Sequence, residues 1–180
     1  EKGEFVSIVG ESGSGKSTLM NIIGVLDRQT EGRYFLEGRD VNMMRDEERS
    51  AIRNRRIGFV FQNFNLFPQY NVLENVTLAA KLQASELPDY KENKASINEE
   101  IDRKAKDILG KVGLLEKLEN YPCELSGGQR QLVDVARAIV QQPRLILFDE
   151  PTSALDYGNQ IKVLKMVDEL SRADGFAAIM

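Results

Sequence analysis

Length, composition and charge place this chain among ordinary globular proteins. It has 180 residues, of which 42% are hydrophobic and 29% charged, so it is long enough to bury a core of its own. The formal net charge of −4 provides no overall basic field that would attract nucleic acid or an anionic membrane surface. The only cysteine, Cys123, excludes an internal disulfide, and we expect it to be a small, partly buried residue.

We expect both ends of the sequence to be cuts within a longer polypeptide. The sequence opens on Glu1, without a methionine or a secretory leader, and it stops at Met180 inside a run that is typical of a strand. No apolar stretch approaches the roughly 20 residues that a membrane-spanning helix needs.

The first 68 residues alternate between strand and helix patterns. Short β-branched or apolar runs bounded by glycine favour strands, and Glu37 with Gly38 marks the centre of a hairpin. The elements expected here are a strand at 5–9, a helix at 16–26, a hairpin at 33–41, a helix at 45–55 and a strand at 57–61.

The middle of the chain, residues 69–137, is more polar and its pattern is helical throughout. Ser96 and Glu99 have the spacing of a capping box. Apolar residues then recur on one face until Gly113, which we expect to end that helix. Residues 85–94 are rich in charge and turn formers, and we expect them to form a solvated loop.

The last third of the chain returns to alternating helices and strands. A capping box of Ser126 and Gln129 opens a helix that stops before Pro143. Residues 144–148 form an apolar run that is typical of a buried parallel strand, followed by a helix at 159–170 and a strand at 176–180. This alternation predicts an α/β fold with a parallel sheet, and the polar middle predicts an inserted helical subdomain.

A glycine-rich loop between the first strand and the first helix matches the pattern G-x-x-x-x-G-K-[ST] at every position. Its glycines let backbone N–H groups approach phosphate oxygens, and the helix that follows directs its positive end at them. Lys16 would reach the β- and γ-phosphates and act in catalysis, and Ser17 would ligate Mg²⁺. The alternative, a turn that binds nothing, is disfavoured by the strand and helix on either side. The residues predicted to bind ATP here are Gly10, Glu11, Ser12, Gly13, Ser14, Gly15, Lys16, Ser17 and Thr18.

Two carboxylates, Asp149 and Glu150, follow the buried strand at 144–148. Ligands of parallel sheets bind at the carboxyl ends of the strands. Asp149 would hold Mg²⁺, and Glu150 would orient or deprotonate the water that attacks the γ-phosphate. A polar strand end before a turn at Pro151 is the alternative, and it is disfavoured by the phosphate loop elsewhere in the chain.

The segment Leu125-Ser126-Gly127-Gly128-Gln129 has the features of a second anion site at a helix N-terminus. One ATP has one γ-phosphate, so two such sites suggest that two chains share two nucleotides. With these residues the sequence resembles the ATP-binding cassette family, whose signature is LSGGQ, over nearly its whole length.

The resemblance implies a fold and a set of further site residues. The fold is a P-loop NTPase core with a parallel sheet and a small antiparallel β part, at 1–68 and 138–180, with an α-helical subdomain at 69–137. Two cassettes pack head to tail, so that Ser126, Gly127, Gly128 and Gln129 contact the nucleotide of the partner. Gln62 corresponds to the Q-loop residue, with a role in Mg²⁺ binding and catalysis, and Asp156 to the D-loop residue at the nucleotide. A transmembrane permease would hold the cassette at the cytoplasmic face of the membrane.

Residues 57–66 and 72–76 resemble the macrolide-exporter, lipoprotein-releasing and antimicrobial-peptide-exporter branch of that family. The sequence departs from the family in three ways. It has no histidine, although the family has a switch histidine after the last strand. The family's adenine-stacking aromatic would precede Glu1. Leu132 and Asp134 replace a common arginine and a common small residue. Because the adenine-stacking aromatic and the switch histidine are missing from this sequence, we expect these 180 residues alone to bind ATP and Mg²⁺ weakly and to hydrolyse ATP slowly or not at all.

The function predicted from the sequence is that of an ATPase that powers an ABC-type transporter, an exporter or a lipoprotein-releasing system. The alternative is a regulatory cassette that controls a membrane protein complex without transport, since its motifs would be identical. A third possibility, an ATPase that acts on DNA or ribosomes, is disfavoured by the acidic charge and by the lack of basic segments or long coiled-coil arms.

Overall fold

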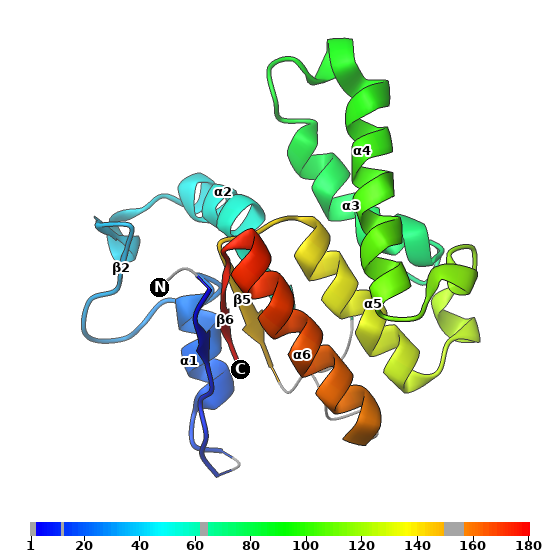
Figure 1. Ribbon diagram of the computed structural model, residues 1–180. Coiled ribbons are helices and arrows are strands. Elements are labelled where there is room, and N and C mark those ends of the chain that lie inside the picture. Colours follow the sequence, from blue (N-terminus) through cyan, green and yellow to red (C-terminus); the bar gives the residue numbers. More distant parts are fainter. Residues whose placement is uncertain (1–2, 12, 62–64, 150–156) are drawn as a thin grey trace.

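The computed structural model describes residues 3–11, 13–61, 65–149 and 157–180. Figure 1 shows a central sheet with helices on both faces and a pair of helices, α3 and α4, that stand away from it. The elements in chain order are β1 (Phe5–Val6), α1 (Lys16–Ile23), β2 (Phe35–Leu36), β3 (Arg39–Asp40), η1 (Val41–Met43), α2 (Asp46–Arg56), β4 (Ile57–Val60), α3 (Val72–Ala84), α4 (Tyr90–Lys111), η2 (Leu115–Lys117), η3 (Pro122–Glu124), α5 (Gly127–Val140), β5 (Leu145–Phe148), α6 (Tyr157–Asp174) and β6 (Ala177–Ile179).

The sheet has the strand order β1-β6-β5-β4, and all of its pairs are parallel. The hairpin β2-β3 forms a separate antiparallel pair. The expected α/β fold with a parallel sheet and a small antiparallel part is therefore confirmed. The order brings β1 and β5 close together on either side of β6, so the loops after β1 and β5 leave the same edge of the sheet.

Successive strand residues point to opposite faces of the sheet, and each face has its own core. Ile146 and Phe148 of β5 join a large cluster with α3, α4, α5 and α6. Leu147, between them, joins a smaller cluster with α1, η1 and α2. The run of apolar residues in β5 arises because both faces of this strand are covered.

Helix α1 ends earlier than the sequence pattern predicts, at Ile23 instead of Leu26. Val25 adopts a left-handed φ of 60°, which turns the chain out of the helix. Two arginines of α2, Arg49 and Arg53, donate hydrogen bonds to the Val25 carbonyl at 3.2 and 3.1 Å. These contacts satisfy a carbonyl at the helix end. The β1 strand is also shorter than expected, since regular pairing stops at Val6.

The loop expected at 85–94 is confirmed for residues 85–89, but it is wrong for residues 90–94, which are helical, and the helix start expected at Ser96 is wrong. Helix α4 begins at Tyr90 and contains one non-helical residue, Asn93, with φ −112° and ψ 16°. Ser96 does not cap this helix: its hydroxyl donates to the Asn93 carbonyl at 3.0 Å. The exposed first turns of α4 lack the apolar periodicity that identifies a helix from sequence.

The end of α4 and the start of α5 follow the sequence pattern. Gly113 has φ +75°, and the Leu114 N–H donates to the Leu109 carbonyl at 2.8 Å, which completes a Schellman motif. At α5, the Gln129 N–H donates to the Ser126 hydroxyl at 3.2 Å and the Ser126 N–H to the Gln129 side chain at 2.9 Å. The predicted capping box is confirmed.

Helix α5 connects the outer helices to the sheet. It packs against α3 and α4 on one side and against β4 on the other. Gly58 of β4 makes this contact close: a Cβ there would lie 3.2 Å from Pro143 Cγ and 3.4 Å from Ala138 Cβ. Cys123, in η3 just before α5, is exposed, so the expectation that it is partly buried is wrong.

Candidate nucleotide site

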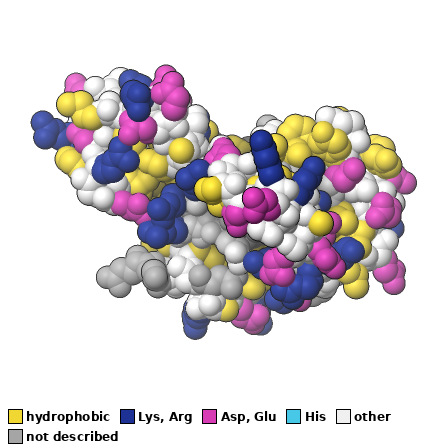
Figure 2. Space-filling view, turned by 90° about the horizontal axis from the view of Figure 1, so that it is seen from above, with side chains coloured by type: hydrophobic (Ala, Val, Ile, Leu, Met, Phe, Trp, Pro, Cys, Tyr) yellow, Lys and Arg dark blue, Asp and Glu magenta, His cyan; other side chains and the backbone are white. Residues whose placement is uncertain are grey.

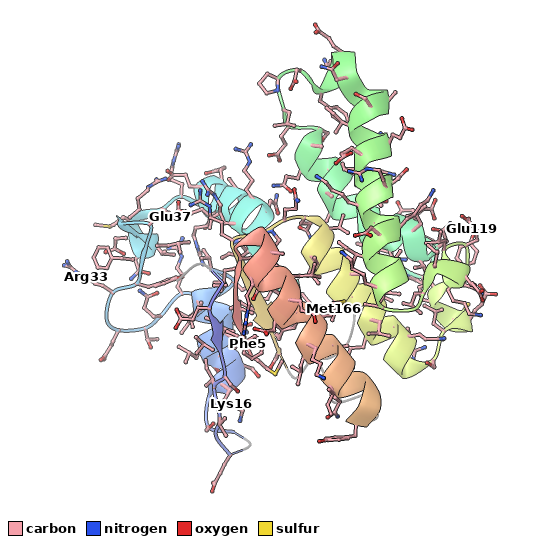
Figure 3. The ribbon with its side chains drawn as sticks, viewed as in Figure 1. Phe5, Lys16, Arg33, Glu37, Glu119 and Met166 are labelled. Carbon is pink, nitrogen blue, oxygen red and sulfur yellow. The ribbon has the colours of Figure 1, made fainter. Side chains whose placement is uncertain are left out.

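The phosphate loop lies between β1 and α1, as the motif predicts (Figure 3, where Lys16 is labelled). Gly13 and Gly15 have φ of +79° and +89°, a conformation that residues with a Cβ rarely adopt. Gly15 occupies the N-cap position of α1. The loop therefore presents its backbone at the N-terminus of a helix, which is the usual position for a bound phosphate group.

Lys16 folds back over its own loop in this structure. Its Nζ donates to the Gly10 carbonyl at 2.8 Å and to the Glu11 carbonyl at 2.7 Å, and it lies 3.5 Å from the Ser14 hydroxyl. The ammonium group is thus held by neutral oxygen acceptors of its own loop. Such a charge can exchange these acceptors for the oxygens of a bound phosphate group.

Ser17 and Asp149 come together although 132 positions separate them in the sequence. The Ser17 hydroxyl donates to Asp149 Oδ1 at 3.1 Å. Asp149 itself follows β5, and its N–H donates to the Val60 carbonyl of β4 at 2.9 Å. The parallel sheet therefore places the acidic end of β5 beside the first turn of α1, and a hydroxyl and a carboxylate oxygen converge there.

Four of the predicted site residues lie outside the described ranges. They are Ser12 of the phosphate loop, the Q-loop residue Gln62, the second carboxylate Glu150 and the D-loop residue Asp156. Thr18 lies in the first turn of α1 and is exposed.

The signature residues are at a different place from the phosphate loop. Ser126, Gly127, Gly128 and Gln129 form the start of α5, and α1 and α5 lie on different sides of the sheet in Figure 1. Within the described part of the chain, the side chains of Ser126 and Gln129 bond to the backbone N–H groups of each other and do not reach the phosphate loop. The structure thus brings together the loop and Asp149, but not the loop and the signature of the same chain.

The sequence predicts no structural role for Asp134; it shows only that this residue replaces a small residue that is common in the family. Its side chain is fully buried, and it accepts the Phe61 N–H at 3.0 Å and pairs with Arg137. Burial raises the pKa of the Asp134 carboxyl to about 6, against the opposing effect of Arg137. Arg137 also donates to the Asn65 carbonyl at 2.8 Å. A signal was present in the sequence: Asp134 is an acid among the apolar residues of α5.

A second buried polar residue that the sequence did not reveal is Asn75 of α3, whose side chain bonds the turn before that helix. Its side chain is fully buried. It accepts the Phe67 N–H at 2.7 Å and donates to the carbonyls of Phe67, Tyr70 and Asn71 at 3.1, 2.8 and 2.9 Å. The turn at residues 67–71 is therefore cross-linked by a single amide group.

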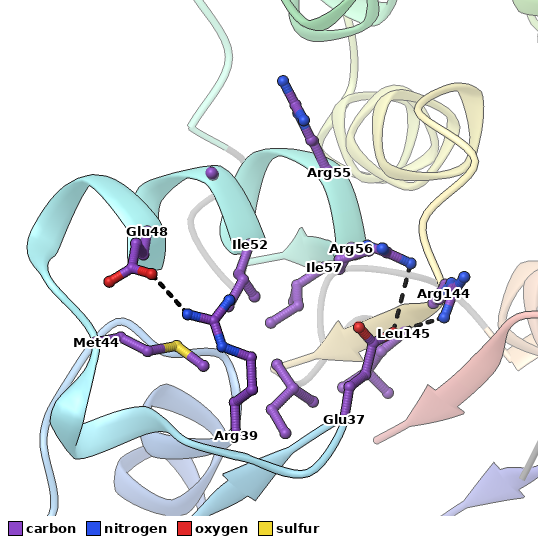
Figure 4. A pocket seen from close by; sticks show the side chains of 12 residues that line it. Glu37, Arg39, Met44, Glu48, Ile52, Arg55, Arg56, Ile57, Arg144 and Leu145 are labelled. Atoms are coloured by element: carbon purple, nitrogen blue, oxygen red, sulfur yellow. Dashed lines mark hydrogen bonds and ion pairs between the residues drawn. The ribbon is translucent and has the colours of Figure 1, made fainter.

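A separate hollow of about 290 Å³ lies between the hairpin, α2 and the starts of β4 and β5 (Figure 4). Its apolar lining includes Ile57 and Leu145. Glu37 on its rim pairs with Arg56 and Arg144, which ties the hairpin to α2 and β5. No described residue of the predicted nucleotide site lines this hollow, so the hollow and the nucleotide site are distinct.

On the face shown in Figure 2, basic and acidic side chains are interspersed.

Comparison with known proteins shows the family. The sequence matches the ABC transporter family over residues 1–153. It is 42% identical over 178 residues to the macrolide export ATP-binding/permease protein MacB of Syntrophobacter fumaroxidans, which covers 99% of this chain and 24% of MacB. It is also 42% identical over 171 residues to the lipoprotein-releasing system ATP-binding protein LolD of Blochmanniella floridana, covering 95% of this chain and 68% of LolD.

The fold has the same relatives. The dimeric structure of a post-hydrolysis state of the ATP-binding cassette MJ0796 from Methanocaldococcus jannaschii, bound to ADP and Pi, has a TM-score of 0.85 at 39% identity. It covers 99% of this chain and 74% of that chain. The chain thus spans about a quarter of the MacB relative and about three quarters of the MJ0796 cassette. Within the described ranges, no helix combines the length and the hydropathy that a membrane crossing requires. This chain is an ATP-binding cassette and belongs to the ABC transporter family.

Proposed function

We propose that this cassette binds ATP with Mg²⁺ and hydrolyses it to drive a membrane transporter of the exporter or lipoprotein-releasing kind. The observation that carries the proposal is the contact between Ser17 and Asp149 at 3.1 Å. It joins the phosphate loop to the acidic end of β5, and a triphosphate with its metal ion requires both. The names of the MacB and LolD relatives support the transport role.

The oxygen atoms at this contact suit Mg²⁺. A serine hydroxyl and a carboxylate are hard ligands. In the part of the chain that the structure describes, no cluster of three or more acidic, histidine or cysteine side chains forms a metal cage. Mg²⁺ is commonly held by one or two protein ligands together with water and substrate phosphates. Ser17, Asp149 and Gln62 would hold the ion, and its charge would offset the charge of the phosphates.

The residues of the chain have separate tasks in this proposal. The loop from Gly10 to Thr18 binds the phosphates, with Lys16 on the β- and γ-phosphates. Glu150 orients or deprotonates the attacking water. We further propose the division into a core at 1–68 and 138–180 and a helical subdomain at 69–137 that passes motion to a transmembrane permease at the cytoplasmic face of the membrane.

A second copy of the chain completes the site in this proposal. Among the described residues, the side chains of Ser126 and Gln129 bond to each other's backbone and not to the phosphate loop. The helix N-terminus of the signature, with the Ser126 hydroxyl, is suited to a γ-phosphate. Head-to-tail pairing would place it on the nucleotide of the partner, with Asp156 nearby. The dimeric form of the MJ0796 cassette, bound to ADP and Pi, supports this arrangement.

The test uses Glu150→Gln in the full-length protein. Removal of the proposed base should allow ATP to bind but not to turn over, so that ATP and Mg²⁺ convert the monomer to a dimer in size-exclusion chromatography with light scattering. The control is the double variant Glu150→Gln with Ser126→Glu, which places a negative charge opposite the γ-phosphate and should stay monomeric. A Glu150→Gln protein that binds ATP yet remains monomeric would show that the shared site is wrong.

A further inference from the structure

A buried ion pair on α5 holds the chain on both sides of residues 62–64. On one side, the Phe61 N–H donates to Asp134 Oδ2 at 3.0 Å. On the other side, Arg137 Nη1 donates to the Asn65 carbonyl at 2.8 Å. Asp134 and Arg137 also bond each other. The signature helix is therefore linked to both flanks of the segment that contains Gln62, through one connected group of hydrogen bonds.

The packing of α5 on β4 explains why these groups meet. Gly58 allows Ala138 to approach β4 closely: a Cβ atom on residue 58 would lie 3.4 Å from the Cβ of Ala138. Asp134 lies one helical turn before Ala138, and Phe61 lies just beyond the end of β4. Helix α5 and strand β4 run in opposite directions. The Asp134 carboxylate therefore lies next to the N–H of Phe61, which is just past the end of β4 and has no partner in the sheet.

The two charges depend on each other. The Asp134 side chain is 0% exposed and that of Arg137 is 12% exposed. Loss of either partner would leave an uncompensated charge in a site from which water is largely excluded. The pair therefore favours one arrangement of α5 relative to Phe61 and Asn65, and it resists small displacements of either element.

We propose that Asp134 and Arg137 are positioning residues that link the placement of the signature helix to the backbone at Phe61 and Asn65, the two flanks of the segment that contains Gln62. This inference rests on the proposed function for the role of Gln62, although the hydrogen bonds themselves do not. A small apolar residue at position 134 would accept no hydrogen bond from Phe61. In this chain, a movement of α5 when the signature engages a nucleotide displaces both flanks of the segment together.

The link itself is tested without nucleotide, by hydrogen–deuterium exchange of the full-length protein. In Asp134→Ala, the protection of a peptide that covers Phe61 should fall by about tenfold, because this N–H loses its charged acceptor. The control is Val133→Ala, which removes a neighbouring buried side chain of α5 without a bond to Phe61. In Val133→Ala, the protection of the peptide that covers Phe61 should change only as much as the protection of the other strands of the sheet. Equal protection of the Phe61 peptide in Asp134→Ala and wild type would overturn the proposal.

The positioning role is tested by separating turnover from nucleotide affinity. Asp134→Ala should lower kcat for ATP by about tenfold and change the ATP dissociation constant by less than about twofold, because the phosphate loop lies on another element. Asp134→Asn retains an oxygen that can accept the Phe61 N–H, so its kcat should lie between those of Asp134→Ala and wild type. This variant also replaces Asp134→Ala in the test if the alanine variant does not fold.

Two results would contradict the positioning role. One is a kcat in Asp134→Ala that equals that of Val133→Ala, and the other is a loss of ATP affinity as large as the loss of kcat. If the wild-type protein neither binds nor hydrolyses ATP, the proposed function fails instead. The exchange measurement then still decides whether Asp134 and Arg137 link α5 to the two flanks.

Discussion

Replacement of Asn75 by aspartate should destabilise the protein strongly, and more at neutral than at acidic pH. The substitution keeps the shape of the side chain and the acceptor for the Phe67 N–H. It removes the amide nitrogen, whose two hydrogens serve three carbonyls at 2.8–3.1 Å. Two lost donors in a fully buried site, together with the new charge facing carbonyl oxygens, correspond to about 3–5 kcal/mol of unfolding free energy.

The pH dependence has a definite sign. Burial among carbonyl oxygens raises the pKa of the new carboxyl in the folded protein, since the charged form is disfavoured there. Stability contributed by a group with a raised folded pKa is greatest at low pH and is lost as the pH rises through that pKa. The deficit of Asn75→Asp relative to wild type should therefore be larger at pH 7.5 than at pH 5, where the neutral acid can donate one hydrogen bond.

Urea denaturation at the two pH values, followed by circular dichroism, measures both effects. The matched control is Asn54→Asp, which makes the same chemical change at an exposed position of α2 and should alter stability by less than about 0.5 kcal/mol. A deficit for Asn75→Asp as small as that of the control, or one that shrinks as the pH rises, would refute the account of this amide as the group that fixes the turn.

Three other substitutions test separate features. Gly24→Ala should destabilise by about 2–3 kcal/mol in urea denaturation, because the new Cβ would lie 1.9 Å from Phe59 Cζ; Gly110→Ala, with nothing within 4 Å, should be neutral or stabilising by up to about 1 kcal/mol. Burial raises the pKa of Asp134 from 3.8 to about 6. The stability that this carboxyl contributes is therefore fully present below pH 3.8 and is lost as the pH rises through about 6. Between pH 4 and 7 wild type should lose up to about 3 kcal/mol relative to Asp134→Asn, and parallel pH profiles would contradict this. Ser126→Ala should lower stability by about 1 kcal/mol through loss of the helix cap, and a thermal melt unchanged from wild type would show that the cap contributes nothing.

The sequence predicts those parts of the fold that depend on local pattern. The phosphate loop, the buried strand at 145–148 and the caps at Ser126 and Gly113 follow from motifs, apolar periodicity and the special conformations of glycine. The sequence pattern places the start of α4 too late, because the first turns of this helix are polar. The spacing of Ser96 and Glu99 fits a capping box, but the helix begins six residues earlier, at Tyr90.

The contacts that shape the candidate site depend on distant residues and were not predictable in this way. Asp134 reads as an anomaly in an apolar helix until β4 brings the Phe61 N–H to it. Asn75 reads as an ordinary polar residue of a helix until the preceding turn folds over its amide. In both cases one polar side chain satisfies backbone groups that no regular element serves, and single-sequence periodicity contains no information about such partners.

The exposed thiol of Cys123 makes the molecule easy to observe. It is the only cysteine among these 180 residues, it is exposed, and it lies three positions before the first residue of the signature cap. Within these 180 residues, a single dye can therefore be attached beside α5 without any engineered cysteine. In a mixture of donor- and acceptor-labelled molecules, energy transfer would follow the approach and separation of two signature helices in real time.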